Sequence, residues 1–371
     1  MDASARMEGR APPKRDYRLN GESTRTAVET GLASAEWYHT EIPRKVMKEL
    51  MQRSDWMAAR DTVIWLGALV LGAAGGIYFW GSWWAAPFFL VYGVLYGSGS
   101  DARWHECGHG TAFRTRWMNE VVYQIASFME MRNPVIWKWS HARHHTDTYI
   151  VGRDAEIAAM RPPDLVRFLL NLVGIMEFWD LGRALLRNAC GHLSADEKEL
   201  TPESERWKAV LVARIHVAIY IATIAVAIIY QTWLPVLLIG GPRIYGIWHI
   251  HVVGLLQHGG LADNVTDHRL NTRTVYMNPL TRFIYWNMNY HVEHHMFPMV
   301  PYHALPRLHE LIKHDLPPAS PSILAGYREM IPAFLRQLRN EDYFLKRELP
   351  PTAKPYREQF HGSAALPTAA E

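Results

Sequence analysis

Long uncharged runs alternate with polar, charged stretches along the chain, and this pattern predicts helices that cross a membrane. Residues 62–80 carry no formal charge and are long enough for a helix that spans a hydrocarbon core of roughly 30 Å. Similar apolar runs follow at 84–100, 210–230 and 233–256. The short connector within each successive pair is uncharged as well. The pattern therefore predicts an all-α integral membrane protein with four transmembrane helices in two hairpins.

The charged residues fall on one side of these predicted spans. Lys and Arg occur in the N-terminal segment, in the region 101–206 and after the fourth span, but in neither tight connector. Because positively charged loops stay in the cytoplasm, we expect both termini and a helical cap to be cytoplasmic. Two helices are predicted to lie on the membrane surface, a basic one at 42–56 and an amphipathic one at 165–187.

These features divide the chain into three parts. Residues 1–60 are predicted to be an N-terminal cytoplasmic segment, with about thirty disordered residues followed by the surface helix. Residues 61–310 form the membrane domain with its cytosolic cap. Residues 311–371 form a C-terminal cytoplasmic segment, whose Pro- and Ala-rich end from residue 350 is expected to be disordered.

Composition removes several other classes of protein. The formal net charge is +3, from 39 Lys and Arg against 36 Asp and Glu, which gives no indication of a nucleic-acid partner. Only two cysteines are present, Cys107 and Cys190. That number excludes a disulfide framework and any four-cysteine iron–sulfur site within the chain.

Eight of the nineteen histidines lie in three short clusters with helical spacing. Positions three and four apart share one face of a helix, so the imidazoles of each cluster can converge. The clusters are His105 with His109, then His141, His144 and His145, then His291, His294 and His295. Imidazole is the commonest metal ligand, and one tetrahedral zinc needs only four donors. Eight converging histidines therefore predict two metal ions.

His258 is predicted to be a ninth ligand. It lies at the predicted cytoplasmic end of the fourth span, seven residues after His251 and so on the same helical face. Metal-bound histidines usually donate their second ring N–H to another group. Candidates for that hydrogen bond, by their closeness in sequence to the ligands, are Glu106, Asp147, Asp154, Glu156, His251, His268 and Glu293.

Imidazole suits iron, zinc, copper and nickel, and redox-inert zinc can serve from one closed or open site. A pair of irons held by neutral imidazoles can bind and reduce O2 and abstract hydrogen from an unactivated C–H bond, which gives an alkene or an alcohol. With no haem-binding domain and no cysteine quartet, the electrons must come from an external ferredoxin, rubredoxin or cytochrome-type donor with its reductase. Lys138, Arg143 and Arg153 are candidate contacts for that donor.

The ordered histidine motifs resemble those of the membrane fatty acid desaturase and hydroxylase superfamily. The segments 154–156 (Asp-Ala-Glu) and 271–274 (Asn-Thr-Arg-Thr) are also similar to its bacterial members, and the likeness extends over 62–309. It implies a four-helix membrane stem, a cytosolic cap and a non-haem di-iron centre with the eight cluster histidines and His258 as ligands. It also implies O2 as co-substrate and a fatty acyl chain on a lipid or thioester carrier as substrate. A hydroxylase, or an oxidative demethylase or desaturase of a small non-lipid molecule, is the alternative.

Two other readings of the histidines stay open at this point. The segment 105–109 also satisfies the His-Glu-x-x-His pattern of zinc proteases, in which Glu106 would be the general base. An intramembrane zinc protease would need one further carboxylate ligand and would leave six cluster histidines without a role. A non-enzymatic metal-binding membrane receptor is the other class. Metal content and O2-dependent turnover would separate the three.

Overall fold

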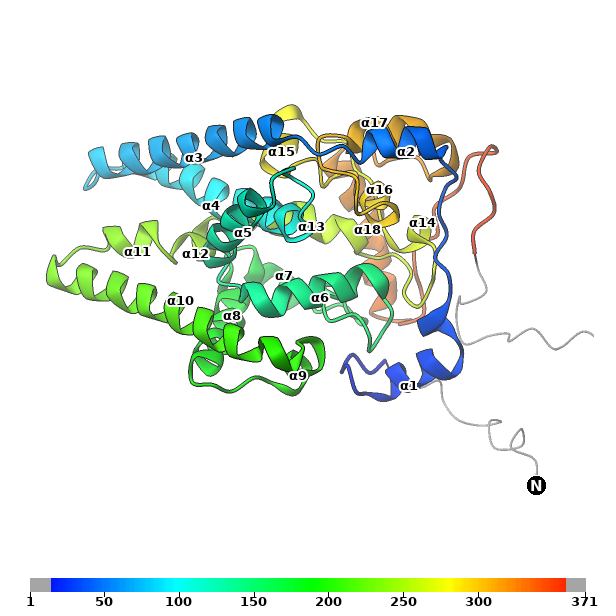
Figure 1. The fold of residues 1–371 in the computed structure, drawn as a ribbon, viewed down its shortest axis with the longest axis horizontal. Coiled ribbons are helices and arrows are strands. Elements are labelled where there is room, and N and C mark those ends of the chain that lie inside the picture. The colour runs from blue at the N-terminus through cyan, green and yellow to red at the C-terminus, as the bar shows by residue number, and fades with distance from the viewer. Residues whose placement is uncertain (1–14, 358–371) are drawn as a thin grey trace, which may run out of the picture.

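The computed structural model describes residues 15–357, and these fold almost wholly into α-helices (Figure 1). Two helical hairpins extend from one side of a broad body. The first hairpin pairs α3 (Asp55–Tyr78) with α4 (Ala85–Gly108), and the second pairs α10 (Glu203–Ile229) with α11 (Leu234–Leu238). The all-α prediction is confirmed.

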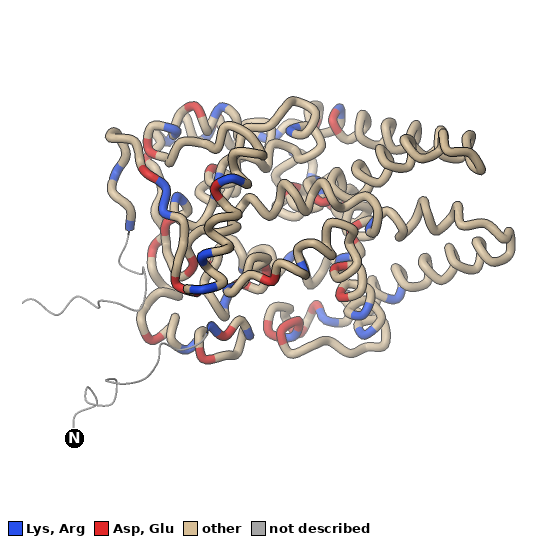
Figure 2. The backbone as a smooth tube through the Cα atoms, turned by 180° about the vertical axis from the view of Figure 1, so that it is seen from behind, with Lys and Arg blue, Asp and Glu red and all other residues tan. Residues whose placement is uncertain are grey.

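Two of the described helices are long and apolar enough to cross a membrane. They are the stretch Arg44–Tyr78, which contains α3, and α10. At 1.5 Å per residue, the 24 residues of α3 and the 27 of α10 rise about 36 and 40 Å. In Figure 2 the charged residues gather on the body, and the outer parts of both hairpins carry none. The prediction of membrane-crossing helices is thus met by two clear spans rather than by four.

The fourth predicted span, 233–256, is not one helix. It is divided into α11, α12 (Pro242–Tyr245) and α13 (Trp248–His258). The chain turns at Gly240, which has a positive φ of 83°, and Pro242 then has no backbone N–H to continue a helical ladder. The hydrophobic run is present as predicted, but these residues interrupt the helix inside it.

Glycines let the interrupted segment pack closely on α4. A Cβ on Gly93 would overlap the Tyr245 ring, and one on Gly97 would lie 3.0 Å from Ile247 Cγ2. A Cβ on Gly246 would run into the backbone of Gly93. Small residues four apart allow helices to approach in this way in membrane proteins. The contact brings α12 and the start of α13 against the first hairpin.

The body contains the remaining helices and most of the buried core. Its largest apolar cluster surrounds Trp104, Tyr285, Trp286 and Tyr302. The helices of the body's first half are α1 (Glu22–Glu29), η2 (Leu32–Ser34), α2 (Arg44–Leu50), α5 (Arg116–Met129), α6 (Pro134–Thr146), α7 (Leu165–Asn171), α8 (Ile175–Ala189) and α9 (Ala195–Leu200). Those of its second half are α14 (His268–Asn271), α15 (Pro279–Ile284), α16 (His291–Met296), α17 (Leu305–Ile312), η3 (Lys313–Asp315) and α18 (Ile323–Gln337).

Both predicted surface helices are divided in the structure. The stretch 42–56 contains only the short α2, and α3 begins before residue 56, where the Ser54 side chain accepts a hydrogen bond from the Met57 N–H. The stretch 165–187 is split into α7 and α8 at Gly174, which has a φ of 61°. A Cβ there would overlap the carbonyl oxygen of Arg243, so glycine is required both for the turn and for the close approach of α12.

The two ends of the described chain lie on the same body as the histidine clusters. The first thirty residues were expected to be disordered, but they include the helix α1. The Arg15 guanidinium also pairs with the Asp263 carboxylate at 2.7 Å. At the other end, the backbone N–H of Arg357 donates to Asp267. Residues 1–14 and 358–371, on which the rest of the disorder prediction falls, lie outside the described residues. The predicted boundary between the membrane domain and the C-terminal segment at residue 310 stays a prediction. Beyond that residue, α18 packs on α13 through Met330.

A buried ion-pair network holds α12 to the body. The Arg243 guanidinium lies 2.6 Å from Glu130 and 3.0 Å from Glu177, and both Arg243 and Glu130 are fully buried. Beside it, Arg132 pairs with Asp101 of α4 at 2.8 Å. The network therefore joins α4, α8 and α12 with the residues that follow α5, at the boundary between the hairpins and the body.

Candidate metal centre

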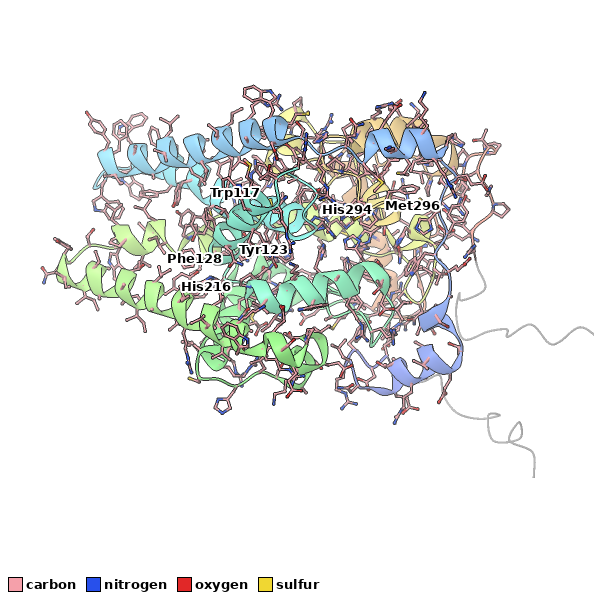
Figure 3. The ribbon with its side chains drawn as sticks, viewed as in Figure 1. Trp117, Tyr123, Phe128, His216, His294 and Met296 are labelled. Atoms are coloured by element: carbon pink, nitrogen blue, oxygen red, sulfur yellow. The ribbon has the colours of Figure 1, made fainter. Side chains whose placement is uncertain are left out.

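All nine histidines predicted as ligands lie together inside the body. They come from four elements that are far apart in sequence: the end of α4, the end of α6, the end of α13, and α16. Figure 3 places His294 there, whereas His216, a histidine outside the predicted set, lies on α10 beside Phe128 with ring centroids 5.2 Å apart. The helical spacing read from the sequence is what directs each cluster into the common space.

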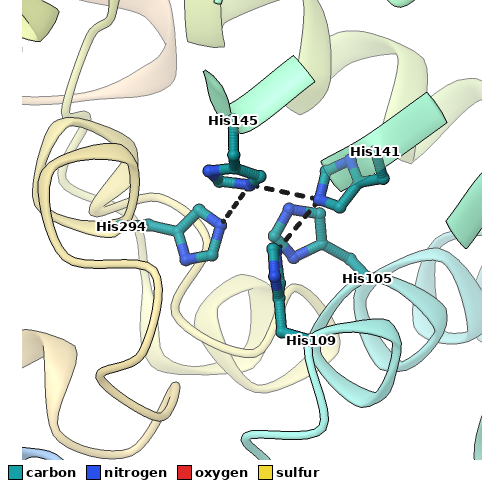
Figure 4. A group of neighbouring side chains, drawn as sticks. All are labelled: His105, His109, His141, His145 and His294. Atoms are coloured by element: carbon teal, nitrogen blue, oxygen red, sulfur yellow. Dashed lines mark hydrogen bonds between the residues drawn. The ribbon is translucent and has the colours of Figure 1, made fainter. Parts of the chain in front are cut away.

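Five of the nine form a compact group, which we call the five-histidine group. Their ligand-capable nitrogens lie within 4.8 Å of one another (Figure 4). The Nε2 atom of His141 is 3.1 Å from that of His109 and 3.2 Å from that of His145, which in turn is 3.2 Å from Nε2 of His294. His105 completes the group, with its ring 4.4 Å from His141.

The other four form a second group, which we call the four-histidine group. His144, His258 and His295 have ligand-capable nitrogens within 4.8 Å of one another. His291 adjoins them, since its Nε2 lies 3.2 Å from that of His258 and 3.1 Å from that of His295. The two groups are in contact, because the rings of His145 and His295 stack at 4.5 Å.

The spacing of these nitrogens matches two ligands on one metal ion. Imidazoles that bind a metal at about 2.1 Å place their nitrogens roughly 3.0 Å apart at a right angle and about 3.4 Å apart at a tetrahedral angle. The Nε2 separations of 3.1 to 3.2 Å fall inside that interval. Each group is thus the size of a single coordination sphere.

Hydrogen bonds at the opposite ring nitrogens aim lone pairs into the groups. His141 Nδ1 faces the Glu156 carboxylate at 3.0 Å, and His144 Nδ1 faces Asp154 at 2.8 Å. These carboxylates accept, so each Nδ1 carries the proton and each Nε2 of the neutral ring presents a lone pair. Lone pairs that converge in this way repel one another unless a cation lies between them.

Two further histidines are held by groups that the sequence analysis did not identify. His258 Nδ1 donates to the carbonyl oxygen of Asn271 at 2.8 Å. His295 Nδ1 lies 3.2 Å from the Thr148 hydroxyl, which itself donates to the carbonyl of His144 and so accepts from the ring. A backbone carbonyl has no sequence signature, and a threonine three residues beyond a histidine cluster is too common to single out.

Buried ring nitrogens without partners provide a second observation, and at His105 it bears on metal binding. Both ring nitrogens of His105, and Nδ1 of His145, His291 and His294, are buried with no hydrogen-bond partner among the described residues. Buried polar atoms in native proteins are nearly always satisfied, so a set of orphans calls for an explanation. Both nitrogens of His105 are orphaned, and a metal ion bound in the five-histidine group would give one of them a partner.

The electrostatics of the site keep most of these rings neutral. Burial, followed by the neighbouring imidazoles, holds the pKa of seven of them well below the usual range: His105, His109, His145, His258, His291, His294 and His295. Burial also lowers the pKa of His144, but the Asp154 and Glu156 carboxylates together outweigh it and the net direction is upward. Neutral rings are the form that binds metals.

The remaining predicted partners do not bond to the ligands. Asp147 pairs with Arg143 and Arg153, and Glu293 pairs with His309 and Thr274. The Glu106 carboxylate accepts from Thr111, and burial raises its pKa to about 7. His251 lies against Phe168, with ring centroids 6.4 Å apart. His268 contacts the site through its ring, 5.2 Å from His295.

The zinc-protease reading of residues 105–109 does not fit this arrangement. His105 and His109 share their group with three more histidines, and that group contains no carboxylate. Glu106 is turned toward Thr111, so it has no position from which to act as a base on a metal-bound water. The described residues therefore do not support the protease alternative.

Comparison with known proteins gives an independent assignment. A family model described as fatty acid desaturase matches residues 81–327. The chain is also similar to the sn-1 oleoyl-lipid 12-desaturase of Synechocystis sp., at 29% identity over 109 residues, which are 29% of this chain and 30% of that protein. It is similar to the Delta(12) acyl-lipid conjugase (11E,13E-forming) of Impatiens balsamina, at 29% identity over 98 residues, which are 26% of this chain and 24% of that protein. These alignments span less than a third of either relative.

Proposed function

The chain belongs to the fatty acid desaturase family, and we propose that it is an O2-dependent di-iron oxidoreductase that desaturates acyl chains carried on lipids. The observation that carries this proposal is the pair of adjoining histidine groups with lone pairs aimed inward. The names of the two relatives support an acyl-lipid substrate, since both describe enzymes of acyl lipids. Desaturation, rather than hydroxylation, is the reaction that the family description shares with the name of the Synechocystis relative.

The proposed reaction consumes one O2 and two electrons for each double bond. A –CH2–CH2– unit, O2, two electrons and two protons give –CH=CH– and two waters. Two bound irons would supply the capacity to reduce O2 and to remove hydrogen from an unactivated C–H bond. The five-histidine group would hold one iron and the four-histidine group the other, with Asp154, Glu156, Asn271 and Thr148 fixing the orientation of the rings.

We propose that both hairpins span the membrane and that the body lies on its cytoplasmic side. The broken segment of α11, α12 and α13 would then serve as the fourth crossing, packed on α4. Exposed aromatic residues at the hairpin tips, among them Trp83, Trp84 and Trp233, support this placement because such side chains favour the membrane interface. The lipid substrate would reach the iron centre from the inner leaflet, and an external donor with its reductase would supply electrons from the cytoplasm.

The test is heterologous expression with a reductase system, followed by fatty acid analysis of the membrane lipids and iron analysis of the purified protein. We expect new unsaturated acyl chains and about two irons per chain. His294→Ala should abolish the product and lower the iron content, whereas His192→Ala, a change of an exposed histidine, should do neither. An unchanged lipid profile with full iron loading would refute the acyl-lipid assignment.

A further inference from the structure

An aromatic stack connects the protein surface with the histidine centre. Trp37 lies between η2 and α2, ahead of the residues that the family model matches, and is partly exposed. Its indole stacks on the ring of His268 with centroids 4.2 Å apart and planes 10° from parallel. His268 is buried, and its ring centroid is 5.2 Å from that of His295 in the four-histidine group.

We propose that Trp37 and His268 form the route by which electrons enter the metal centre. The inference rests on the proposed function, because it supplies the two electrons which that reaction needs. Electron tunnelling through protein weakens steeply with distance, and rings in contact couple better than saturated chains do. His295 itself is only 2% exposed, so a protein carrier cannot reach it directly. Through Trp37 and His268, a carrier at the surface is separated from His295 by two rings in contact.

The surroundings of Trp37 indicate what kind of carrier would dock. The indole N–H donates to the carbonyl of Thr146 at 3.0 Å, at the end of α6. In that same segment, Arg143 and Arg153 both pair with Asp147, each at 3.1 Å. Two guanidinium groups thus share one carboxylate and leave one net positive charge in the segment next to Thr146, the residue that Trp37 contacts. The surface fits an acidic one-electron carrier protein, which would deliver its electrons in two successive transfers.

If Trp37 had only a structural role, its loss would slow reduction by every reductant alike. The test therefore compares two reductants. The purified, iron-loaded full-length protein is reduced either by a reduced [2Fe–2S] ferredoxin or by dithionite with methyl viologen, and loss of the oxidised-iron absorbance is followed by stopped flow. In Trp37→Leu we expect the ferredoxin rate to fall severalfold, while iron content and the dithionite rate stay unchanged. Trp37→Phe keeps the ring without the N–H and should restore most of the ferredoxin rate.

Trp117→Leu is the matched control, because Trp117 is an exposed tryptophan on α5 (Figure 3). Its ferredoxin rate should equal that of the wild type. The proposal is overturned if Trp37→Leu reduces like the wild type with ferredoxin, if Leu and Phe are equally slow, or if both reductants slow together. A wild type that dithionite reduces and ferredoxin does not would also overturn it. Failure of the wild type to bind iron or form an alkene would instead count against the proposed function.

Discussion

Removing the carboxylate of Asp154 should cost the protein one metal ion before the other. Its Oδ2 accepts from His144 Nδ1 and from the Tyr149 N–H, each at 2.8 Å, and its Oδ1 accepts from the Glu156 N–H at 2.8 Å. In Asp154→Ala the His144 ring loses the acceptor that holds the proton on Nδ1. The ring can then rotate or carry its proton on Nε2, and either change removes one donor from the four-histidine group.

The size of the effect follows from what such outer partners contribute. Loss of a group that orients a metal-bound histidine typically lowers metal affinity or activity about 10- to 100-fold, which corresponds to roughly 1.4–2.7 kcal/mol. Asp154 serves the four-histidine group, whereas Glu156 serves His141 of the five-histidine group. Titration of Asp154→Ala with a chelator should therefore show a drop from two irons toward one, at a chelator concentration that leaves the wild type intact.

Glu156→Gln is the matched comparison for this experiment. Its amide oxygen can replace Oε2 as the acceptor for His141, and its NH2 can donate to the Ser140 hydroxyl that now donates to Oε1 at 2.8 Å. We therefore expect a smaller loss than in Asp154→Ala. Metal analysis by mass spectrometry reports the stoichiometry, and circular dichroism checks the fold. The reasoning is refuted if folded Asp154→Ala keeps both irons with the chelator resistance of the wild type.

Three further predictions concern stability. Glu130→Ala leaves the buried Arg243 without its closest partner and should destabilise the protein by about 3–5 kcal/mol, seen as a lower Tm in detergent; an unchanged Tm would contradict it. Gly246→Ala forces a side chain against the backbone of Gly93 and should lower the free energy of unfolding by about 1–3 kcal/mol. Gly254→Ala in α13 meets open space and should be neutral or stabilising, so equal Tm values for the two variants would contradict the packing argument. Metal-free protein should lose stability as the pH falls below about 6.5, because the clustered histidines take up protons there in the unfolded chain but not in the folded one. A Tm that does not change with pH across that range would disprove this prediction.

The candidate metal centre was the part of the protein most accessible from sequence. Spacings of three and four residues fix which histidines share a helical face, whatever the helices pack against. His258 needed one more assumption, that the fourth hydrophobic run ends on the same side as the clusters. Its Nε2 lies 3.2 Å from that of His291, which agrees with that assumption. Asp154 and Glu156 were found because a ligand's partner often lies a few residues away, although Asp147 and Glu293 met the same criterion and bond elsewhere.

Features set by long-range contacts were not accessible in the same way. Hydropathy predicts how many apolar residues follow one another, not whether they form one helix. The run 233–256 has the length of a span but turns at Gly240 and Pro242. The carbonyl of Asn271 and the hydroxyl of Thr148 reach the histidines only because distant segments fold together. Stacking of Trp37 on His268 likewise joins segments more than two hundred residues apart.

The break in the fourth hydrophobic run has a consequence for the site itself. Because α13 is a separate short helix, its direction depends in part on what holds α12, and the contacts there include the Gly93–Gly246 packing and the ion pairs of Arg243. The same network reaches the proposed metal ligands along α4, since Asp101, the partner of Arg132, lies one helical turn before His105. Buried ion pairs add little net stability compared with apolar packing, but they form only when the charged groups have a well-defined geometry. Their place between hairpins and body therefore suits the alignment of α13 and α4, so that His258 and His105 reach their two groups from different helices.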